Sequence, residues 1–183
     1  MGRTATDKQV RDNHMRLAQS LVQKGYTWQQ MEAGDRSHLQ VRCRARLAGS
    51  ASFTIADHDG GIVCVDSSGK IAGGLVFMAA NFPEGSVSVH VRALVVEPTH
   101  ERRGVATVTL NMLPQVLDGY GVRATNGATR LAYGGCEPSA AVLYRKAGYE
   151  VSRPGAPLTL EVGTGASVTS DNPVYSCWFK RAI

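Results

Sequence analysis

The chain lacks the features that mark several large classes of protein. No apolar run in its 183 residues approaches the ~18 residues of a membrane-spanning helix, and the N-terminus has no apolar stretch like that of a signal peptide. We therefore expect no membrane partner and a cytoplasmic location. Two phosphate-binding patterns are also missing: the Walker loop G-x-x-x-x-G-K-S/T and the dinucleotide-binding turn G-x-G-x-x-G.

Cysteine is scarce, and its spacing does not match common metal sites. Cys43, Cys64, Cys136 and Cys177 form no C-x-x-C pair and no Cys/His set with zinc-ligand spacing. We expect reduced thiols that mostly fill the core, and no metal site. Cys136 precedes a predicted helix start, where a thiolate would be stabilised. No histidine lies near it in the sequence, however, so core packing is the preferred interpretation.

Charged residues make up only 19% of the chain and hydrophobic residues 43%, which is typical of a globular domain. At this length, and without repeats or linkers, we expect one domain over residues 1–183. The net charge of +5 favours an acidic ligand or partner. Many basic residues lie within 8–46 without interleaved aromatics, which indicates a solvated helical face rather than a nucleic-acid groove.

Two capping boxes mark the N-terminal part of the chain. Residues 6–9 predict the start of a helix that Gly25 closes, and residues 27–30 predict the start of a second helix. Residues 38–47 fit either a helix or a strand by periodicity, and we prefer the helix. Residues 1–47 are therefore expected to be mainly helical.

The rest of the chain alternates between predicted strands and helices. Residues 61–66 and 71–79 predict a hairpin, and residues 105–117 predict a helix that Pro114 shortens or kinks. Residues 163–172 indicate a polar loop. Four further strands are predicted, over residues 86–96, 128–133, 149–153 and 174–180.

The loop between strand 86–96 and the helix after it has the sequence Glu-Arg-Arg-Gly-Val-Ala, residues 101–106. A glycine at such a turn lets the backbone approach a ligand closely, because no Cβ intervenes. The first N–H groups of the following helix have no partner inside the helix, so they favour an anion. The segment therefore predicts a site for a phosphate or pyrophosphate.

This loop resembles the pyrophosphate loop of the GNAT superfamily of acyl-CoA-dependent N-acyltransferases, Gln/Arg-x-x-Gly-x-Gly/Ala. Gly104 and Ala106 fit the pattern, whereas Glu101 stands where Gln or Arg is usual. Residues 137–150 resemble the second GNAT signature, roughly Asn-x-x-Ala-x-x-Leu-Tyr-x-Lys/Arg-x-Gly-Phe/Tyr, although Glu137 replaces the Asn. The matching residues are Ala140, Leu143, Tyr144, Lys146, Gly148 and Tyr149.

The two signatures, in this order, make residues 60–151 similar to a GNAT core. The resemblance implies an α/β (α+β) fold, with a mixed, mostly antiparallel sheet of about six or seven strands flanked by about four helices. The sheet would be splayed between its fourth and fifth strands. Residues 60–151 would bind acetyl-CoA, and residues 152–183 would add C-terminal strands. GNAT chains usually begin with a strand, which is here absent, displaced into residues 38–56, or disguised.

The resemblance also implies that acetyl-CoA is the cosubstrate. The pantetheine would bond to the exposed backbone of the fourth strand, and the pyrophosphate to the N–H groups of the loop. The predicted cofactor-binding residues are Leu94, Val95, Val96, Arg102, Arg103, Gly104, Val105, Ala106, Thr107 and Ser139.

Catalysis requires a general acid and a way to deprotonate the amine. Tyr144 matches the family tyrosine that protonates the leaving thiolate. Some GNATs use a Glu where this chain has Ala132, and others an acidic residue where it has His90, whose ordinary pKa near ~6.5 suits proton removal. We predict His90 as the base, with Glu97, His100 or an ordered water chain as alternatives.

The predicted activity is acetyl transfer to a primary amine by direct attack in a ternary complex. The acceptor would be a small molecule or a peptide, and the protein a monomer or homodimer. One alternative is a catalytically silent GNAT-like module that binds CoA or a partner. Another is an acetyltransferase acting on aminoacyl-tRNA, which is supported only by the basic residues in the N-terminal half of the chain.

Overall fold

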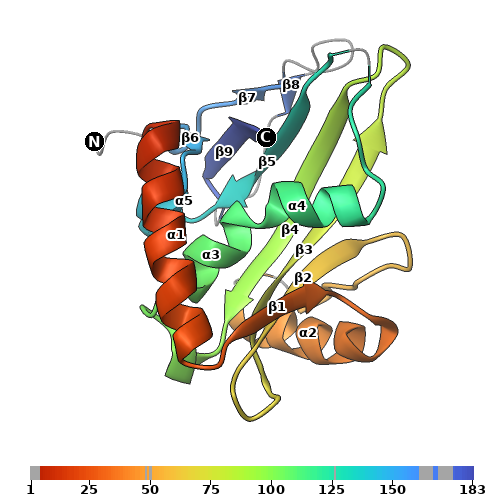
Figure 1. The fold of residues 1–183 in the computed structure, drawn as a ribbon. Coiled ribbons are helices and arrows are strands. Elements are labelled where there is room, and N and C mark those ends of the chain that lie inside the picture. The colour runs from red at the N-terminus through yellow and green to blue at the C-terminus, as the bar shows by residue number, and fades with distance from the viewer. Residues whose placement is uncertain (1–4, 48, 50, 126, 161–166, 169–174) are drawn as a thin grey trace.

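The computed structural model describes residues 5–47, 49, 51–125, 127–160, 167–168 and 175–183. Within them, a seven-stranded sheet has the order β1-β2-β3-β4-β5-β9-β6, and all its neighbours are antiparallel except the parallel pair β4 and β5 (Figure 1). The predicted mixed, mostly antiparallel sheet is confirmed. Its strands are β1 (Thr27–Gln30), β2 (Gly60–Val65), β3 (Ile71–Asn81), β4 (Val87–Val96), β5 (Arg130–Cys136), β6 (Glu150–Val151) and β9 (Cys177–Ala182).

The remaining described elements are helices and one small strand pair. The strands β7 (Leu158–Thr159) and β8 (Ser167–Val168) pair apart from the main sheet. Two short 3-10 helices, η1 (Pro98–His100) and η2 (Pro138–Ala140), precede longer helices. The α-helices are α1 (Asp7–Gln23), α2 (Ala33–Arg46), α3 (Val105–Asn111), α4 (Leu113–Gly119) and α5 (Ala141–Lys146). Among the described helices, none is long and apolar enough to cross a bilayer.

Helices pack on both faces of the sheet because side chains alternate along its strands. Ile62 of β2 packs in one cluster with Leu110 of α3, whereas its neighbour Val63 packs with Leu39 of α2. Figure 1 shows α1, α3 and α4 on the near face and α2 on the far side. Leu39 is fully buried, and such burial stabilises the fold by about 1.5–3 kcal/mol.

The first capping box is confirmed. The side chain of Thr6 accepts a hydrogen bond from the amide of Gln9 at 3.3 Å, and the Gln9 side chain accepts one from the amide of Thr6 at 2.9 Å. Gly25 follows the helix with φ +82°, as the sequence predicts for a helix end.

The helix predicted to start at residues 27–30 is wrong, because these residues form β1. Thr27 to Gln30 pair antiparallel with β2, and the indole of Trp28 donates a hydrogen bond to Thr109 of α3 at 2.9 Å. These long-range contacts outweigh the local capping preference. The helix starts later, at Ala33, where Glu32 and Asp35 form a capping box. The first strand of the described sheet was therefore disguised as a helix start, and it follows α1 in the chain.

The other predicted elements are present, with shifted ends. Residues 38–47 belong to α2 up to Arg46, and the predicted helix 105–117 divides at Met112 with Pro114 in the first turn of α4. The predicted strand 149–153 is reduced to the two residues of β6. Most of the predicted polar loop 163–172 lies outside the described residues.

The splay between the fourth and fifth strands is clear in the register. Pairing between β4 and β5 runs from Val87 opposite Arg130 to His90 opposite Tyr133, and stops there. Both strands continue beyond this point, and β5 remains paired with β9 as far as Cys136. Beyond His90, the edge of β4 that faces β5 therefore pairs with no strand among the described residues.

Candidate active site

A cleft of about 1010 Å³ opens where β4 and β5 part. Of the predicted site residues, the one that does not line it is Arg103. The roles of these residues stay predictions, but the fold brings them together from three separate stretches of chain. The predicted residues that line the cleft are His90, Leu94, Val95, Val96, Arg102, Gly104, Val105, Ala106, Thr107, Ser139 and Tyr144.

One wall of the cleft is the unpaired edge of β4. On its other edge, β4 is bonded to β3, with a bulge where Val76 opposes Ala93 and Phe77 opposes Val91, so that Arg92 is the extra residue. A bulge twists the strand and re-aims the extra side chain. The backbone groups of β4 that face away from β3 after His90 thus have no described strand as a partner, and extended ligand chains bind such edges.

The phosphate loop has a concave backbone. Arg102 has φ +58°, which makes it the one described residue besides glycine with a positive φ, and Gly104 has φ +98°. A Cβ at Gly104 would lie 3.0 Å from Cδ2 of Leu17 on α1. Both the positive φ and this close approach therefore favour glycine here. No described residue accepts a hydrogen bond from the amides of residues 102–107. Such a row of free N–H groups is suited to an anion.

The carboxylate of Glu101, which departs from the family pattern, does not stand alone. It forms an ion pair with Arg46 at the end of α2, and both residues line the cleft. One turn earlier on the same helix, Arg42 pairs with Glu97 at 2.8 Å. The sequence offered no signal for Arg46, because its partner lies 55 residues away.

Arg103 was predicted to bind the cofactor, but it does not line the cleft, and its side chain contacts Tyr26 instead. Its Nη1 donates to the hydroxyl of Tyr26 at 3.4 Å. That hydroxyl also lies 2.7 Å from Nδ1 of His100, whose Nε2 is 3.5 Å from a carboxylate oxygen of Asp66. The described contact of the Arg103 side chain is thus with Tyr26, outside the cleft, whereas His100, one of the alternative bases, lines the cleft and contacts both Tyr26 and Asp66.

Tyr144 lies on α5 and lines the cleft. Its ring stacks on Phe179 with centroids 3.8 Å apart and meets Tyr149 edge-on at 6.0 Å. The side chain is buried, yet its hydroxyl has no hydrogen-bond partner among the described residues. Burial, above all, and the neighbouring Cys136 raise the pKa of the phenol well above its ordinary value. The hydroxyl therefore stays protonated near pH 7, so that a proton is present on this side chain of the cleft.

His90 is the last residue of β4 that pairs with β5. Its ring stacks on Tyr133 of β5, with centroids 5.0 Å apart and planes at 10°. Burial is the main cause that lowers the pKa of the imidazole; Arg92 lowers it further, and Asp59 opposes the shift. The ring is therefore neutral near pH 7 and able to accept a proton. The alternative base Glu97 is paired with Arg42 and does not line the cleft.

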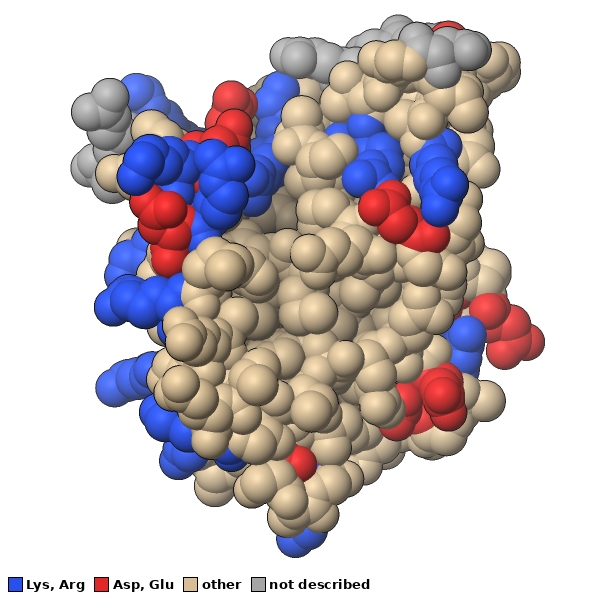
Figure 2. All heavy atoms as spheres, viewed as in Figure 1, with Lys and Arg blue, Asp and Glu red and all other residues tan. Residues whose placement is uncertain are grey.

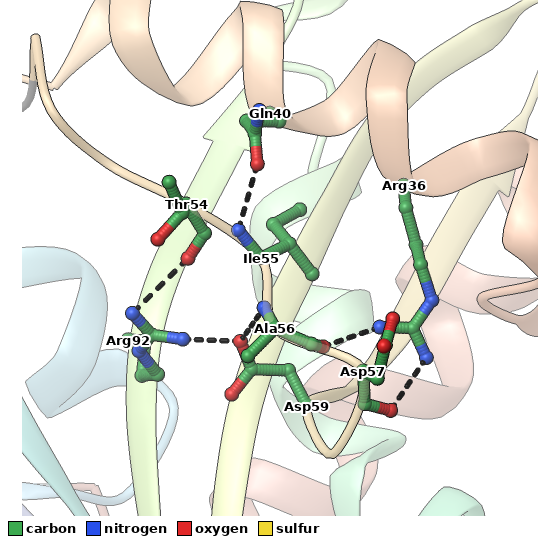
Figure 3. A network of polar contacts seen from close by, with 8 residues as sticks. All are labelled: Arg36, Gln40, Thr54, Ile55, Ala56, Asp57, Asp59 and Arg92. Atoms are coloured by element: carbon green, nitrogen blue, oxygen red, sulfur yellow. Dashed lines mark hydrogen bonds and ion pairs between the residues drawn. The ribbon is translucent and has the colours of Figure 1, made fainter.

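A polar network from the segment between α2 and β2 surrounds Arg92 (Figure 3). Asp59, whose side chain is fully buried, forms an ion pair with Arg92 and accepts from the amide of Ala56 at 2.7 Å. Arg92 also donates to the carbonyl of Thr54 at 3.2 Å and lies 5.1 Å from the ring of Phe53. The sequence analysis missed these residues, because no local pattern links the segment to β4.

Other reactive groups near the cleft have no evident catalytic use. Burial raises the pKa of the Cys136 thiol to about 12, so it is protonated and a poor nucleophile. The hydroxyl of Ser139 donates to Glu137 at 3.3 Å. In the described part of the chain, no three His, Cys, Asp or Glu residues gather as metal ligands would.

Neither a protein-family model nor a curated protein matches the sequence. Solved structures do match the fold. An acetyltransferase of the GNAT family from Staphylococcus aureus Mu50 is 8% identical, with a TM-score of 0.57, covering 86% of this chain and 99% of its own. NAA60 from Arabidopsis thaliana, in complex with a bisubstrate analogue, is 12% identical with a TM-score of 0.56, covering 86% and 97%.

A third similar structure is an aminoglycoside 6′-N-acetyltransferase complexed with coenzyme A. It is 12% identical, with a TM-score of 0.56, and the match covers 85% of this chain and 96% of that one. At such identities the likeness concerns the fold. It agrees with the sheet order, the parallel β4–β5 pair and the splay after His90. The chain thus has the fold of the GNAT family of N-acetyltransferases, as its two signatures predicted.

Proposed function

We propose that the protein is an acetyl-CoA-dependent N-acetyltransferase that acetylates a primary amine. The observation that carries this proposal is the end of β4–β5 pairing at His90, which opens a cleft between the free edge of β4, the phosphate loop and Tyr144. The coenzyme A and the bisubstrate analogue in two structures of the same fold support acyl-CoA as the ligand.

In this proposal, the cofactor is held mainly by backbone groups. The pantetheine extends along β4 and bonds to the backbone near Leu94, Val95 and Val96, in the manner of an added strand. The pyrophosphate lies on the free amides of residues 102–107. Backbone recognition tolerates changes of side chain, which is consistent with the departures at Glu101 and Glu137.

The two titratable groups then serve opposite steps of direct transfer in a ternary complex. His90, neutral near pH 7, takes a proton from the attacking amine, directly or through water. A backbone N–H of β4 polarises the thioester carbonyl. Tyr144 gives its proton to the thiolate as the C–S bond breaks. The acetyl group passes to nitrogen, and CoA leaves as the thiol.

The acceptor is proposed to be a free or peptide amine rather than an RNA-bound one. Three of the four arginines of α2 are bonded to neighbouring segments: Arg36 to carbonyls of residues 56 and 57, Arg42 to Glu97 and Arg44 to the carbonyl of Phe53. The fourth, Arg46, lines the cleft proposed for acyl-CoA. In Figure 2, Lys and Arg side chains lie mainly along the edge near α1, the centre of the face is largely uncharged, and a smaller group with charges of both signs lies near the end of α4, where Asp118 pairs with Arg130. The described residues of this face form no basic groove for a nucleic acid.

The test is consumption of the acetyl-CoA thioester, followed by free thiol release, across a panel of amines that includes polyamines, aminoglycosides, amino acids and short peptides. Thiol release that depends on one class of amine, with the matching acetylated product by mass spectrometry, is the expected result. Tight CoA binding without turnover on any amine would instead indicate the silent binding module. An unchanged thioester together with no CoA binding would contradict both readings.

A further inference from the structure

The phosphate loop carries a negative charge where its ligand is also negative. Glu101 is the first residue of the loop, lines the cleft, and has a side chain that is 44% exposed. A carboxylate beside a pyrophosphate raises the energy of the complex, since like charges at short range repel. The rest of the molecule has to offset this repulsion if the proposed cofactor is to bind.

Arg46 is placed to do so. It is the last helical residue of α2, and its Nη2 pairs with Oε1 of Glu101. The same helix is anchored by Leu39 and Cys43, which are fully buried against the sheet. Arg46 lies one turn beyond Cys43, so the position of its backbone is fixed while its side chain, 38% exposed, reaches the cleft.

The guanidinium of Arg46 retains donors for a ligand. An arginine has five N–H groups in a planar fork that matches phosphate oxygens. The contact with Glu101 is the one interaction of the Arg46 side chain with a described residue, and it uses a single nitrogen. Arg46 lines the same cleft as Arg102 and Gly104, so its remaining donors are within the site proposed for the pyrophosphate.

We propose that Arg46 is a pyrophosphate-binding residue of the acyl-CoA site, supplied by α2 and oriented by Glu101. The resemblance places Gln or Arg at the first position of the loop; here the loop has a carboxylate, and the cation comes from a helix 55 residues earlier. This inference rests on the proposed function. It adds a residue that neither signature contains.

The same helix offers a matched control. Arg42 lies one turn before Arg46, pairs with Glu97 of the adjoining segment at 2.8 Å, and does not line the cleft. The side chains of both arginines are similarly exposed, 42% for Arg42 and 38% for Arg46. Loss of either ion pair should loosen the contact between α2 and residues 97–101 to a similar extent. Only the loss of Arg46 should weaken the binding of a phosphate-containing ligand.

The experiment measures the Kd of CoA, 3′-dephospho-CoA and pantetheine by calorimetry for the wild type, Arg46→Gln and Arg42→Gln. We expect Arg46→Gln to weaken CoA and dephospho-CoA by the same factor, about tenfold or more, since a charge-assisted hydrogen bond is lost. Pantetheine, which has no phosphate, should bind the wild type and Arg46→Gln with equal affinity. Arg42→Gln should leave all three affinities within about twofold of wild type.

A rescue separates phosphate binding from mere support of the loop. Glu101→Arg in the Arg46→Gln background puts the cation back into the loop itself, at the position where the family pattern has it. We expect CoA affinity to return to within about threefold of wild type. A double variant that binds CoA as weakly as Arg46→Gln would overturn the inference.

The outcomes also distinguish this inference from the proposed function. If the wild type binds CoA and Arg46→Gln binds it equally well, Arg46 has no such role while the proposed function stands. A loss that is the same for pantetheine as for CoA would likewise reject phosphate contact. If the wild type binds none of the three ligands, the proposed function and the inference fall together.

Discussion

The two sides of the cleft are built on different principles. On the cradle side, residues 93–96 and 101–107, the edge of β4 turned away from β3 pairs with no described strand and the amides of residues 102–107 have no described acceptor. On the connector side, residues 47–59 with Arg92, structure depends on side-chain pairs such as Arg92 with Asp59, 33 residues apart in sequence. The cradle side therefore depends on conformation, and the connector side on charge pairing.

This difference predicts how each side responds to mutation. Changes that alter backbone conformation on the cradle side should weaken CoA. Changes in the connector pairs should lower the stability of the fold or the rate of acetyl transfer, and leave CoA affinity nearly unchanged. His90 and Tyr144, where the two sides meet, should affect turnover alone.

The largest effect is expected from Tyr144→Phe. Loss of the general acid should lower kcat by about 10²–10⁴-fold, while the Kd of CoA stays within about twofold, because the phenol donates only as the thiolate leaves. Steady-state kinetics and calorimetry measure the two quantities. Tyr149→Phe is the matched control, since it removes a hydroxyl from the same aromatic cluster but does not line the cleft. Equal loss of kcat in both variants would remove Tyr144 from the mechanism.

His90→Gln should lower kcat/KM by about 10²-fold and change its pH dependence. Burial lowers the pKa of His90, so the wild-type base is neutral at and above pH ~6.5 and becomes protonated only as pH falls below that value. Wild-type activity should therefore show an inflection below about pH 6.5, with activity lost on the acid side. The variant should lack this inflection. A variant that keeps the full inflection would assign it to another group.

Gly104→Ala probes the conformation of the cradle. A side chain at φ +98° costs about 1–2 kcal/mol, and its Cβ would lie 3.0 Å from Leu17. We expect CoA to bind about tenfold more weakly, because the amides of the loop shift. Gly121→Ala is the control, with φ +72° and no atom within 4 Å of a built Cβ. It should lose similar stability but bind CoA normally; equal CoA loss in both would contradict a local effect.

Asp59→Asn probes the connector side. The ion pair with Arg92 weakens, and urea unfolding should show a loss of about 1.5–3 kcal/mol. The Kd of CoA should stay within about twofold. Asp12→Asn, which breaks an exposed pair with Lys8 on α1, should change the unfolding curve very little. A strong loss of CoA binding in Asp59→Asn would show that the two sides are coupled, against the comparison drawn above.

The sequence predicted the cradle side well because its determinants are local. A glycine with an anion-accepting backbone needs only a strand, a turn and a helix in succession, and residues 86–117 contain them. Tyr144 belongs to a continuous signature and lies in the same cleft, while its role stays a prediction. The helix predicted at residues 27–30 shows the limit: a capping box is a local preference, and pairing with β2 overrides it.

The connector side was not predictable from the sequence. Asp59 and Arg92, like Arg46 and Glu101, meet only after α2 has packed on the sheet, and no spacing rule links them. The bulge that re-aims Arg92 depends on the register between β3 and β4.

The central claim, an acyl-CoA site in the β4–β5 cleft, is tested most directly by thermal unfolding with and without acetyl-CoA. At 100 times its Kd, a ligand of the native state stabilises it by about 2.7 kcal/mol. For a domain of this size, that raises Tm by about 5–11 °C. We expect such a rise with acetyl-CoA, and a much smaller one with acetyl-pantetheine, which lacks the pyrophosphate. An unchanged Tm at saturating acetyl-CoA would contradict the account.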